Sequence, residues 1–285
     1  MGYPLPLAPR SVCLDARVPD AKLPAALTAP KTRALTLCGV LVGALLGVAA
    51  FAPLPYTRTM PGSTSDVLGA YEGRPVLTVT GAPTRQTDGQ LRMVTISATS
   101  PGERISLWTA LRSWVDQDEA VLPSEAVYPQ KDPAKAEQET RHEMTQSQDS
   151  ATVAALKYLN LSPEKVKVQV DLGDIGGPSA GQLLALGIID KLAGDGKGGD
   201  LSGGKVIAGT GTIDEQGNVG AVGGVPLKTQ AAARDGATVF LLPQAECSDA
   251  KVNTPAGLRL VPVRTLSDAV AALDALKAGG SVPSC

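Results

Sequence analysis

The feature that most constrains this chain is an apolar run near its N-terminus. No charged residue lies between Ala34 and Tyr56, and Leu35–Leu54 is about 20 residues of mostly apolar character. That length matches the hydrocarbon core of a bilayer, about 30 Å at 1.5 Å per residue. A surface helix of a soluble domain normally carries a polar stripe, and this segment has none. We therefore expect residues 34–56 to be a transmembrane signal anchor in contact with lipid.

The charges beside this run predict its orientation. Basic residues outnumber acidic ones before it, whereas Arg58 is the one nearby positive charge after it. The positive-inside bias places residues 1–33 in the cytoplasm as a disordered tail, and everything after Tyr56 outside the cytoplasmic membrane. The expected protein is thus single-pass in the cell membrane with an extracytoplasmic domain. A cleaved signal peptide is the alternative, because Ala50-Phe51-Ala52 has the small-x-small form of a cleavage site.

Composition excludes several classes of function. The 285 residues include 26 Lys+Arg and 28 Asp+Glu, and this net charge of −2 gives no electrostatic case for a nucleic-acid partner. A hydrophobic content of 43% is enough for a packed core. The chain has one histidine, His142, and no C-x-x-C pair among its four cysteines. Multi-histidine sites, zinc ribbons and thioredoxin-type sites are therefore excluded.

Hydrophobic patterns after residue 57 predict an α+β domain, because strands and helices mix without strict βαβ repetition. Pro75–Thr80 and Leu91–Ser97 both alternate, and the turn-rich Gly81–Gly89 between them predicts a β-hairpin. Other strands are expected at 166–172, 206–208, 211–214, 239–242 and 258–261. Helices are expected at 105–115, 150–159, 179–192, 226–234 and 266–276, with 131–142 a charged, solvated stretch. We divide this part into a β-rich segment, 57–130, and a second domain, 131–285.

Two motifs resemble known sites but lack their partners. Gly199–Lys205 fits most of a phosphate-binding P-loop, but Val206 stands where Ser or Thr must hold magnesium, and a strand follows where a helix is needed. Ser162-Pro-Glu-Lys165 matches the S-x-x-K motif of penicillin-recognising enzymes, but the S-D-N and K-T-G partners are missing. Neither motif is assigned a function.

A third motif can carry nucleophilic chemistry. Ser179 lies in Gly176-Gly-Pro-Ser-Ala-Gly181, a glycine-rich turn between an expected strand and an expected helix. Such a turn exposes the hydroxyl, and free backbone N–H groups at a helix start can hold an oxyanion. The alternative is a helix N-cap, a role in which serine is common.

A serine nucleophile needs a base. His142 lies in a charge-rich helix and is better interpreted as a solvated surface residue. Lys228 follows Gly223-Gly-Val-Pro-Leu in an apolar setting, and burial there would lower the pKa of its amine. An exposed helix lysine is the alternative that spacing alone leaves open.

Three motifs in order resemble the proteolytic domain of Lon. They are Gly177-Pro-Ser179-Ala-Gly181, Gly209-Thr210-Gly-Thr-Ile-Asp-Glu-Gln-Gly217, and Gly223-Gly-Val-Pro-Leu-Lys228 with Ala231–Ala233 and Gly236. The resemblance covers roughly residues 145–262. It implies a serine peptidase of the S16 type with the fold of that domain, which is like domain 2 of ribosomal protein S5.

The resemblance assigns roles to particular residues. It implies Ser179 as nucleophile, Lys228 as general base, and Thr210 as a hydrogen-bond partner of the lysine. Gly177, Pro178 and Ala180 complete the serine motif. The family often has an acid three places before the serine, where this chain has Gly176, and Asp174 is the nearest acid. A protein or peptide substrate is implied, without metal or cofactor, and homo-oligomers occur in such families.

Lon carries an ATPase module, which this chain lacks. An anchor followed by an exported Lon-like domain is similar to the YlbL-like membrane-anchored peptidases, whose PDZ domain is missing here because only Asn160–Lys165 occupies its place. The expected function is ATP-independent endoproteolysis of extracytoplasmic proteins. A catalytically inactive binding or scaffold module is the main alternative, and an amidase or esterase with the same dyad is another.

Two cysteines, Cys247 and Cys285, lie in the part expected to be exported, where a disulfide can persist. We expect them to pair and to hold the C-terminal tail. Two unpaired thiols are the alternative.

Overall fold

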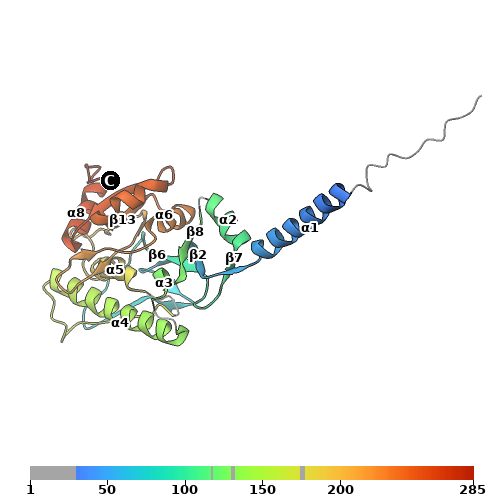
Figure 1. The fold of residues 1–285 in the computed structure, drawn as a ribbon. Coiled ribbons are helices and arrows are strands. Elements are labelled where there is room, and N and C mark those ends of the chain that lie inside the picture. The colour runs from blue at the N-terminus through green and yellow to red at the C-terminus, as the bar shows by residue number, and fades with distance from the viewer. Residues whose placement is uncertain (1–29, 117, 130–131, 174–176) are drawn as a thin grey trace, which may run out of the picture. The chain divides into compact units, whose positions relative to one another are not determined.

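A computed structural model describes residues 30–285 apart from 117, 130–131 and 174–176 (Figure 1). Contacts divide the chain after Ala50 into two units, which are described separately. The first contains α1 (Pro30–Ala50), a helix without a buried residue. It is long and apolar enough to cross a membrane, and a signal sequence meets the same criterion. The helix ends six residues before the expected boundary at Tyr56, because Pro53 and Pro55 cannot continue it.

The second unit, residues 51–285, is organised around a mixed six-stranded sheet. Its strand order is β14-β13-β10-β6-β2-β8. Four neighbouring strands run parallel: β14 (Arg259–Val263), β13 (Val239–Pro243), β10 (Val206–Gly209) and β6 (Gln90–Ala98). The long β2 (Tyr56–Asp66) is antiparallel to β6 and to β8 (Ala120–Pro123). Strands from residues 57–130 and from residues 131–285 therefore share one sheet.

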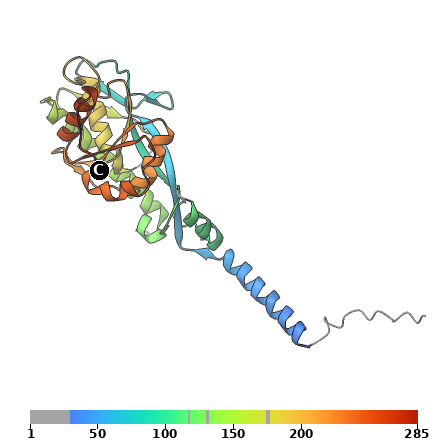
Figure 2. The same cartoon turned by 90° about the horizontal axis from the view of Figure 1, so that it is seen from above.

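Alternation along the central strands supplies two cores on opposite faces of the sheet. One face carries Ile207, Leu241 and Val261 against α5 (Gly181–Leu192), α4 (Pro133–Tyr158) and α8 (Leu266–Lys277). The other carries Ala208 and Phe240 against α6 (Val225–Arg234). Figure 2 shows the helices on both sides of the sheet. Neighbours along a strand point to opposite faces, so residues one apart in β10 pack against different helices.

Short elements complete this unit. In the described part of the chain, four two-stranded pairs accompany the main sheet: β1 (Pro53–Leu54) with β7 (Ile105–Ser106), β3 (Ala70–Tyr71) with β4 (Arg74–Pro75), β5 (Leu77–Thr80) with β9 (Lys167–Val170), and β11 (Thr212–Ile213) with β12 (Val219–Gly220). The remaining helices are α2 (Leu107–Val115), α3 (Ser124–Val127), α7 (Cys247–Ala250), and the 3-10 turns η2 (Pro178–Ala180), η3 (Gln244–Glu246) and η4 (Lys251–Asn253).

The expected hairpin between Pro75–Thr80 and Leu91–Ser97 is wrong. β5 pairs with β9, far along the chain, and β6 pairs with β2 and β10. The connection between β5 and β6 is held by Arg85, whose guanidinium donates to the backbone carbonyls of Asp190 (3.2 Å) and Gly198 (2.9 Å). These bonds draw the connection toward the end of α5, so β5 and β6 do not close on each other.

The helix expected at 150–159 begins earlier, because α4 starts at Pro133 and includes most of the charged stretch 131–142. Asp132 caps the helix by accepting from the Ala134 N–H at 3.0 Å, and Pro133 stands in the first turn, where its missing N–H costs nothing. The charges are the exposed face of the helix, with Glu137 and Arg141 paired across one turn.

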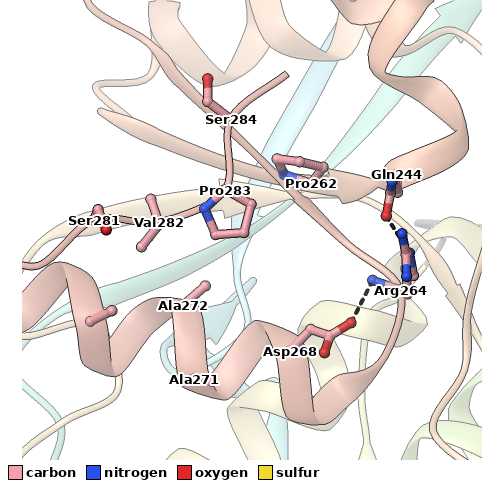
Figure 3. A pocket seen from close by; sticks show the side chains of 11 residues that line it. Gln244, Pro262, Arg264, Asp268, Ala271, Ala272, Ser281, Val282, Pro283 and Ser284 are labelled. Carbon is pink, nitrogen blue, oxygen red and sulfur yellow. Dashed lines mark hydrogen bonds between the residues drawn. The ribbon is translucent and has the colours of Figure 1, made fainter.

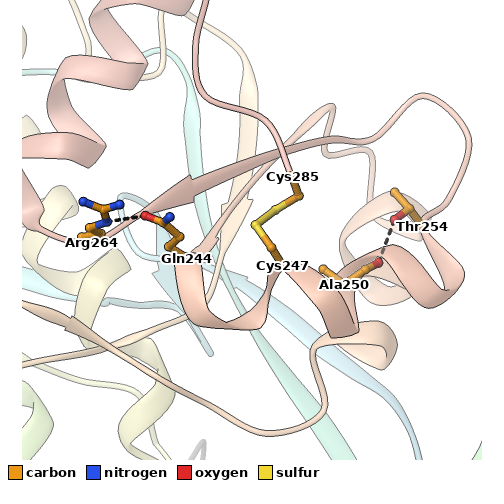
Figure 4. Close-up of a disulfide and its surroundings, with 6 residues drawn as sticks. All are labelled: Gln244, Cys247, Ala250, Thr254, Arg264 and Cys285. Atoms are coloured by element: carbon orange, nitrogen blue, oxygen red, sulfur yellow. Dashed lines mark hydrogen bonds between the residues drawn. A yellow bond between two sulfur atoms is a disulfide. The ribbon is translucent and has the colours of Figure 1, made fainter.

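A disulfide attaches the C-terminal end of the chain to α7. The structure joins Cys247, at the start of α7, to Cys285 in a disulfide with a Cα–Cα distance of 5.3 Å (Figure 4). Residues 281–284 face β14 and α8 across a cavity of about 510 Å³ (Figure 3). Beside it, the Arg264 guanidinium donates to the Gln244 side chain, and the Arg264 N–H donates to the Asp268 carboxylate at 3.1 Å.

A thiol count tests the disulfide. The full chain, denatured without reductant, is expected to show two reactive thiols, since two of its four cysteines are paired, and four after reduction. Replacing Cys285→Ser should release the thiol of Cys247. Reduction should also lower the free energy of unfolding by about 2–4 kcal/mol, because the bond constrains the unfolded chain. Four reactive thiols before reduction would contradict the pairing.

Candidate active site

The backbone that presents Ser179 is set by a glycine and a proline. Gly177 has φ +118° and ψ 151°, a region that glycine adopts at little cost, although a Cβ there would meet nothing within 4 Å. Pro178 then opens η2, which contains Ser179 and leads into α5. Ser179 thus lies at the N-terminal end of a helix. Asp174 and Gly176 lie outside the described residues.

Ser147 of α4, which lies outside the three sequence motifs, holds this turn. Ser147 Oγ donates to the Pro178 carbonyl at 2.9 Å. The two helices approach closely at Gly181, where a Cβ would lie 2.8 Å from Ser147 Oγ and 2.9 Å from a methyl of Ile213. Glycine at 181 is therefore required by space. The sequence signal for Ser147 was faint, a serine among polar residues of a charged helix.

Thr210 joins the serine segment to the lysine. It follows β10 directly and is fully buried, and its N–H donates to the Leu241 carbonyl at 3.0 Å. Its hydroxyl donates to the Ser179 carbonyl (3.2 Å) and accepts from Lys228 Nζ (3.0 Å). The Gly211 N–H also donates to the Ser179 carbonyl, at 2.9 Å. The three residues singled out from the sequence therefore meet at the carboxyl end of β10.

Lys228 reaches this point from the opposite face of the sheet. It lies in the first turn of α6, after Gly224 with φ +70° and Pro226. Its side chain is 3% exposed, so the alternative of a solvated helix lysine is wrong. Burial lowers the pKa of the amine to about 8, with the negative charge of Glu246 acting in the opposite direction. Within the described part of the chain, no carboxylate lies within salt-bridge distance of Lys228 Nζ.

Thr210 links Lys228 to the backbone carbonyl of Ser179 and not to its hydroxyl. Ser179 Oγ makes no hydrogen bond with the residues that the structure describes. An amine with a pKa near 8 is neutral in about one molecule in ten at pH 7 and can then accept a proton. The arrangement therefore contains a buried potential base within two hydrogen bonds of the serine backbone.

A groove of about 300 Å³ borders the serine turn between α4 and β11. Its lining consists of polar residues of α4, the first residue of η2, and β11 with the residue after it, which are Glu143, Gln146, Ser147, Ser150, Pro178, Thr212, Ile213 and Asp214. The groove therefore borders Pro178, the residue that precedes Ser179.

The other motifs lie apart from this site. His142 is exposed on α4, as expected. Gly199–Lys205 precedes the strand β10, so no helix start faces it. The Ser162 carbonyl accepts from the N–H groups of Lys165 and Val166, which makes S-x-x-K an ordinary turn.

Comparison with known families agrees with this geometry. Residues 141–273 match the family model of the Lon protease (S16) C-terminal proteolytic domain. This segment is similar to a serine peptidase domain. The match begins within α4, ends within α8, and includes Ser179, Thr210 and Lys228. It supports serine peptidase activity, and with it a protein substrate. The strands β2, β6 and β8 precede the matched segment and complete its sheet.

Removing the Thr210 hydroxyl tests the contact between the two segments. Thr210→Val is expected to lower the free energy of unfolding by about 1–3 kcal/mol, because a buried amine and a buried carbonyl each lose a partner. Thr210→Ser keeps the hydroxyl and should recover most of this loss. Urea denaturation at pH 7 measures both. Equal stability of Thr210→Val and the parent chain would show that the contact is not formed.

Proposed function

We propose that this chain is a membrane-anchored, ATP-independent serine endopeptidase that hydrolyses peptide bonds of extracytoplasmic proteins with a Ser179–Lys228 dyad. The observation that carries the proposal is the burial of Lys228 beside Thr210, which bridges its amine to the Ser179 segment. The similarity of residues 141–273 to a Lon proteolytic domain supports the same chemistry.

The mechanism follows from the groups at the site. Neutral Lys228 takes the proton of Ser179 Oγ as the oxygen attacks the substrate carbonyl, and backbone N–H groups beside Ser179 hold the oxyanion. The ammonium then protonates the leaving amine, and water hydrolyses the acyl-enzyme through the same base. Thr210 holds the lysine in both protonation states, since its oxygen accepts from the amine and from the ammonium. In free enzymes, catalytic hydrogen bonds are often long or poorly aligned, and they tighten when substrate binds.

Anchoring and orientation complete the proposal. The apolar run that starts at Ala34 within α1 is preceded by five basic and two acidic residues, and this excess supports a cytoplasmic N-terminus and an exported catalytic unit. The groove beside Pro178 is the proposed path of the substrate. Asp174 as an acidic gate, substrate capture without a PDZ domain, and assembly into homo-oligomers remain hypotheses derived from the resemblance.

One observation favours a rival function. Ser179 Oγ has no hydrogen bond to Lys228 in the described part of the chain, which is the arrangement expected if the domain served as a binding or scaffold module. The rival predicts that the dyad variants keep the full activity of the parent chain in every assay.

Peptide hydrolysis by site variants separates these functions. The full chain in detergent micelles, incubated with a mixture of denatured proteins, is expected to generate new peptide termini detectable by mass spectrometry. Ser179→Ala and Lys228→Met should each reduce the rate by a factor on the order of 10⁴, because nucleophile and base act as a unit.

The S-x-x-K motif at Ser162–Lys165 provides matched control variants, because it contains a serine and a lysine outside the proposed site. Ser162→Ala and Lys165→Met should cleave like the parent chain, because these residues form an ordinary turn. Cleavage that survives Ser179→Ala would remove this serine from the reaction. No cleavage by any chain, the parent included, would favour the scaffold function.

The pH dependence follows from the lysine. Because the base must be neutral, kcat/KM is expected to rise about tenfold per pH unit below the pKa of about 8 and to level off above it. The stability effect has the same origin. The folded pKa lies below the ordinary value of 10.5, so burial of the ammonium destabilises the fold most below pH 8, and this cost is lost as pH rises toward 10.5.

Lys228→Met should therefore stabilise the chain at pH 7, by up to about 3 kcal/mol, while abolishing hydrolysis. Denaturation at pH 7 and at pH 10 measures the effect, which should be smaller at the higher pH. An activity profile without a limb near pH 8, or a Met variant less stable than the parent at pH 7, would argue against a buried amine with this pKa.

A further inference from the structure

The helix α2 carries an exposed apolar surface that the proposed chemistry does not use. Trp108, Trp114 and Val115 are 62%, 78% and 85% exposed, and Leu111 between them is 46% exposed. These four residues form what we term the α2 face. Large side chains with this exposure are normal when isolated, but a contiguous group of them on one short helix marks an interaction surface.

The rest of α2 is fixed to the domain. Ser106 caps the helix by accepting from the Thr109 N–H at 3.1 Å, and the inward Ser113 is 1% exposed. Figure 1 shows α2 beside β7 and β8, which are among the elements it contacts. The α2 face therefore lies opposite the side of the helix on which Ser113 is buried.

Chain connectivity limits how far this helix can be from the end of α1. β1 begins three residues after Ala50, and it pairs with β7, the strand that leads directly into α2. Leu54 lies four residues from the end of α1, which is at most about 14 Å of extended chain. Leu54 and Tyr56 also line a cavity of about 180 Å³ together with Leu111 and Trp114.

The residue types favour lipid as the occupant. Trp108 and Trp114 are the two tryptophans of the whole sequence, and tryptophan is the side chain most characteristic of the membrane–water interface. The exposed charges nearby are mixed, with Arg104 and Arg112 against Glu103 and Asp116. A contact made by apolar insertion, without an excess of positive charge, does not require anionic headgroups.

We infer that the α2 face inserts into the headgroup region of the bilayer in which α1 is anchored, as a second membrane contact. This inference rests on the proposed anchoring by α1. The contact would fix the orientation of residues 51–285 toward the membrane surface, and with it the approach of substrates to the groove beside Pro178.

Tryptophan fluorescence reports on this face alone, since both tryptophans lie in α2. The full chain is reconstituted into phosphatidylcholine vesicles whose acyl chains are brominated either near the headgroup or near the terminal methyl. Quenching by the shallow bromines, exceeding that by the deep ones and unchanged in high salt, is the expected result. Trp108→Phe and Trp114→Phe assign the loss of emission to each tryptophan in turn.

A charge placed on the face provides the decisive variant and keeps both probes. Val115→Glu is expected to remove most of the lipid quenching while the chain stays with the vesicles through α1. Val252→Glu is the matched control, because Val252 is equally solvated, at 79% exposure, but lies on η4. The brominated lipids should quench the tryptophan emission of this variant as strongly as that of the parent chain.

The other outcomes overturn the inference in distinguishable ways. Emission untouched by bromine but quenched by aqueous acrylamide would place the α2 face in water. Emission insensitive to both quenchers would mean that protein, such as a second copy of this chain, covers it. A chain that does not remain with the vesicles would refute both the anchor and the second contact, whereas peptide hydrolysis in the same sample tests the dyad separately.

Discussion

The burial of the Lys228 amine is the constraint on which the site depends. A lysine almost entirely withdrawn from water must give up much of its preference for the charged form. Among the described residues, the hydrogen bond to the Thr210 hydroxyl and the more distant charge of Glu246 compensate for this burial. Two hydrogen bonds hold Thr210 in position for this contact. Its backbone N–H donates to the Leu241 carbonyl, and its hydroxyl donates to the Ser179 carbonyl. The sheet thus provides the rigidity that the amine requires.

The sheet also explains how residues from opposite sides of the domain meet. Ser179 comes from the helix on one face and Lys228 from the helix on the other, and the strands between them are packed with side chains. The two can approach each other only beyond the end of a strand. Thr210 and Gly211 continue β10 past its pairing with β13, at the carboxyl edge where parallel sheets commonly place their ligands. A Cβ at residue 211 would lie 2.5 Å from the Gln182 carboxamide oxygen, so only glycine lets the chain pass this close to Gln182.

Much of this arrangement could be predicted from the sequence, because its signals are local. The glycine-rich turn before Ser179, the proline in the first turn of α6 and the short apolar runs of the strands at 206 and 239 each depend on a few neighbouring residues. The pairing of β5 was not predictable in this way, since its partner β9 lies about 90 residues away and the choice depends on where Arg85 binds. The burial of Lys228 and the hydrogen bond from Ser147 to the Pro178 carbonyl likewise form only when the helices pack against the sheet and one another.

Helix polarity adds a final element to the chemistry of the site. Lys228 stands in the first turn of α6, near the positive end of that helix, where a cation is disfavoured. The same polarity at the start of α5 favours negative charge beside Ser179. Both effects act in the direction that the proposed reaction needs, toward a neutral amine before attack and a stabilised oxyanion during it. Glu246 acts against the first of them and keeps the pKa of the amine from falling further than about 8. The resulting amine is still basic enough to take a proton from serine, which an amine depressed by several more units would not be.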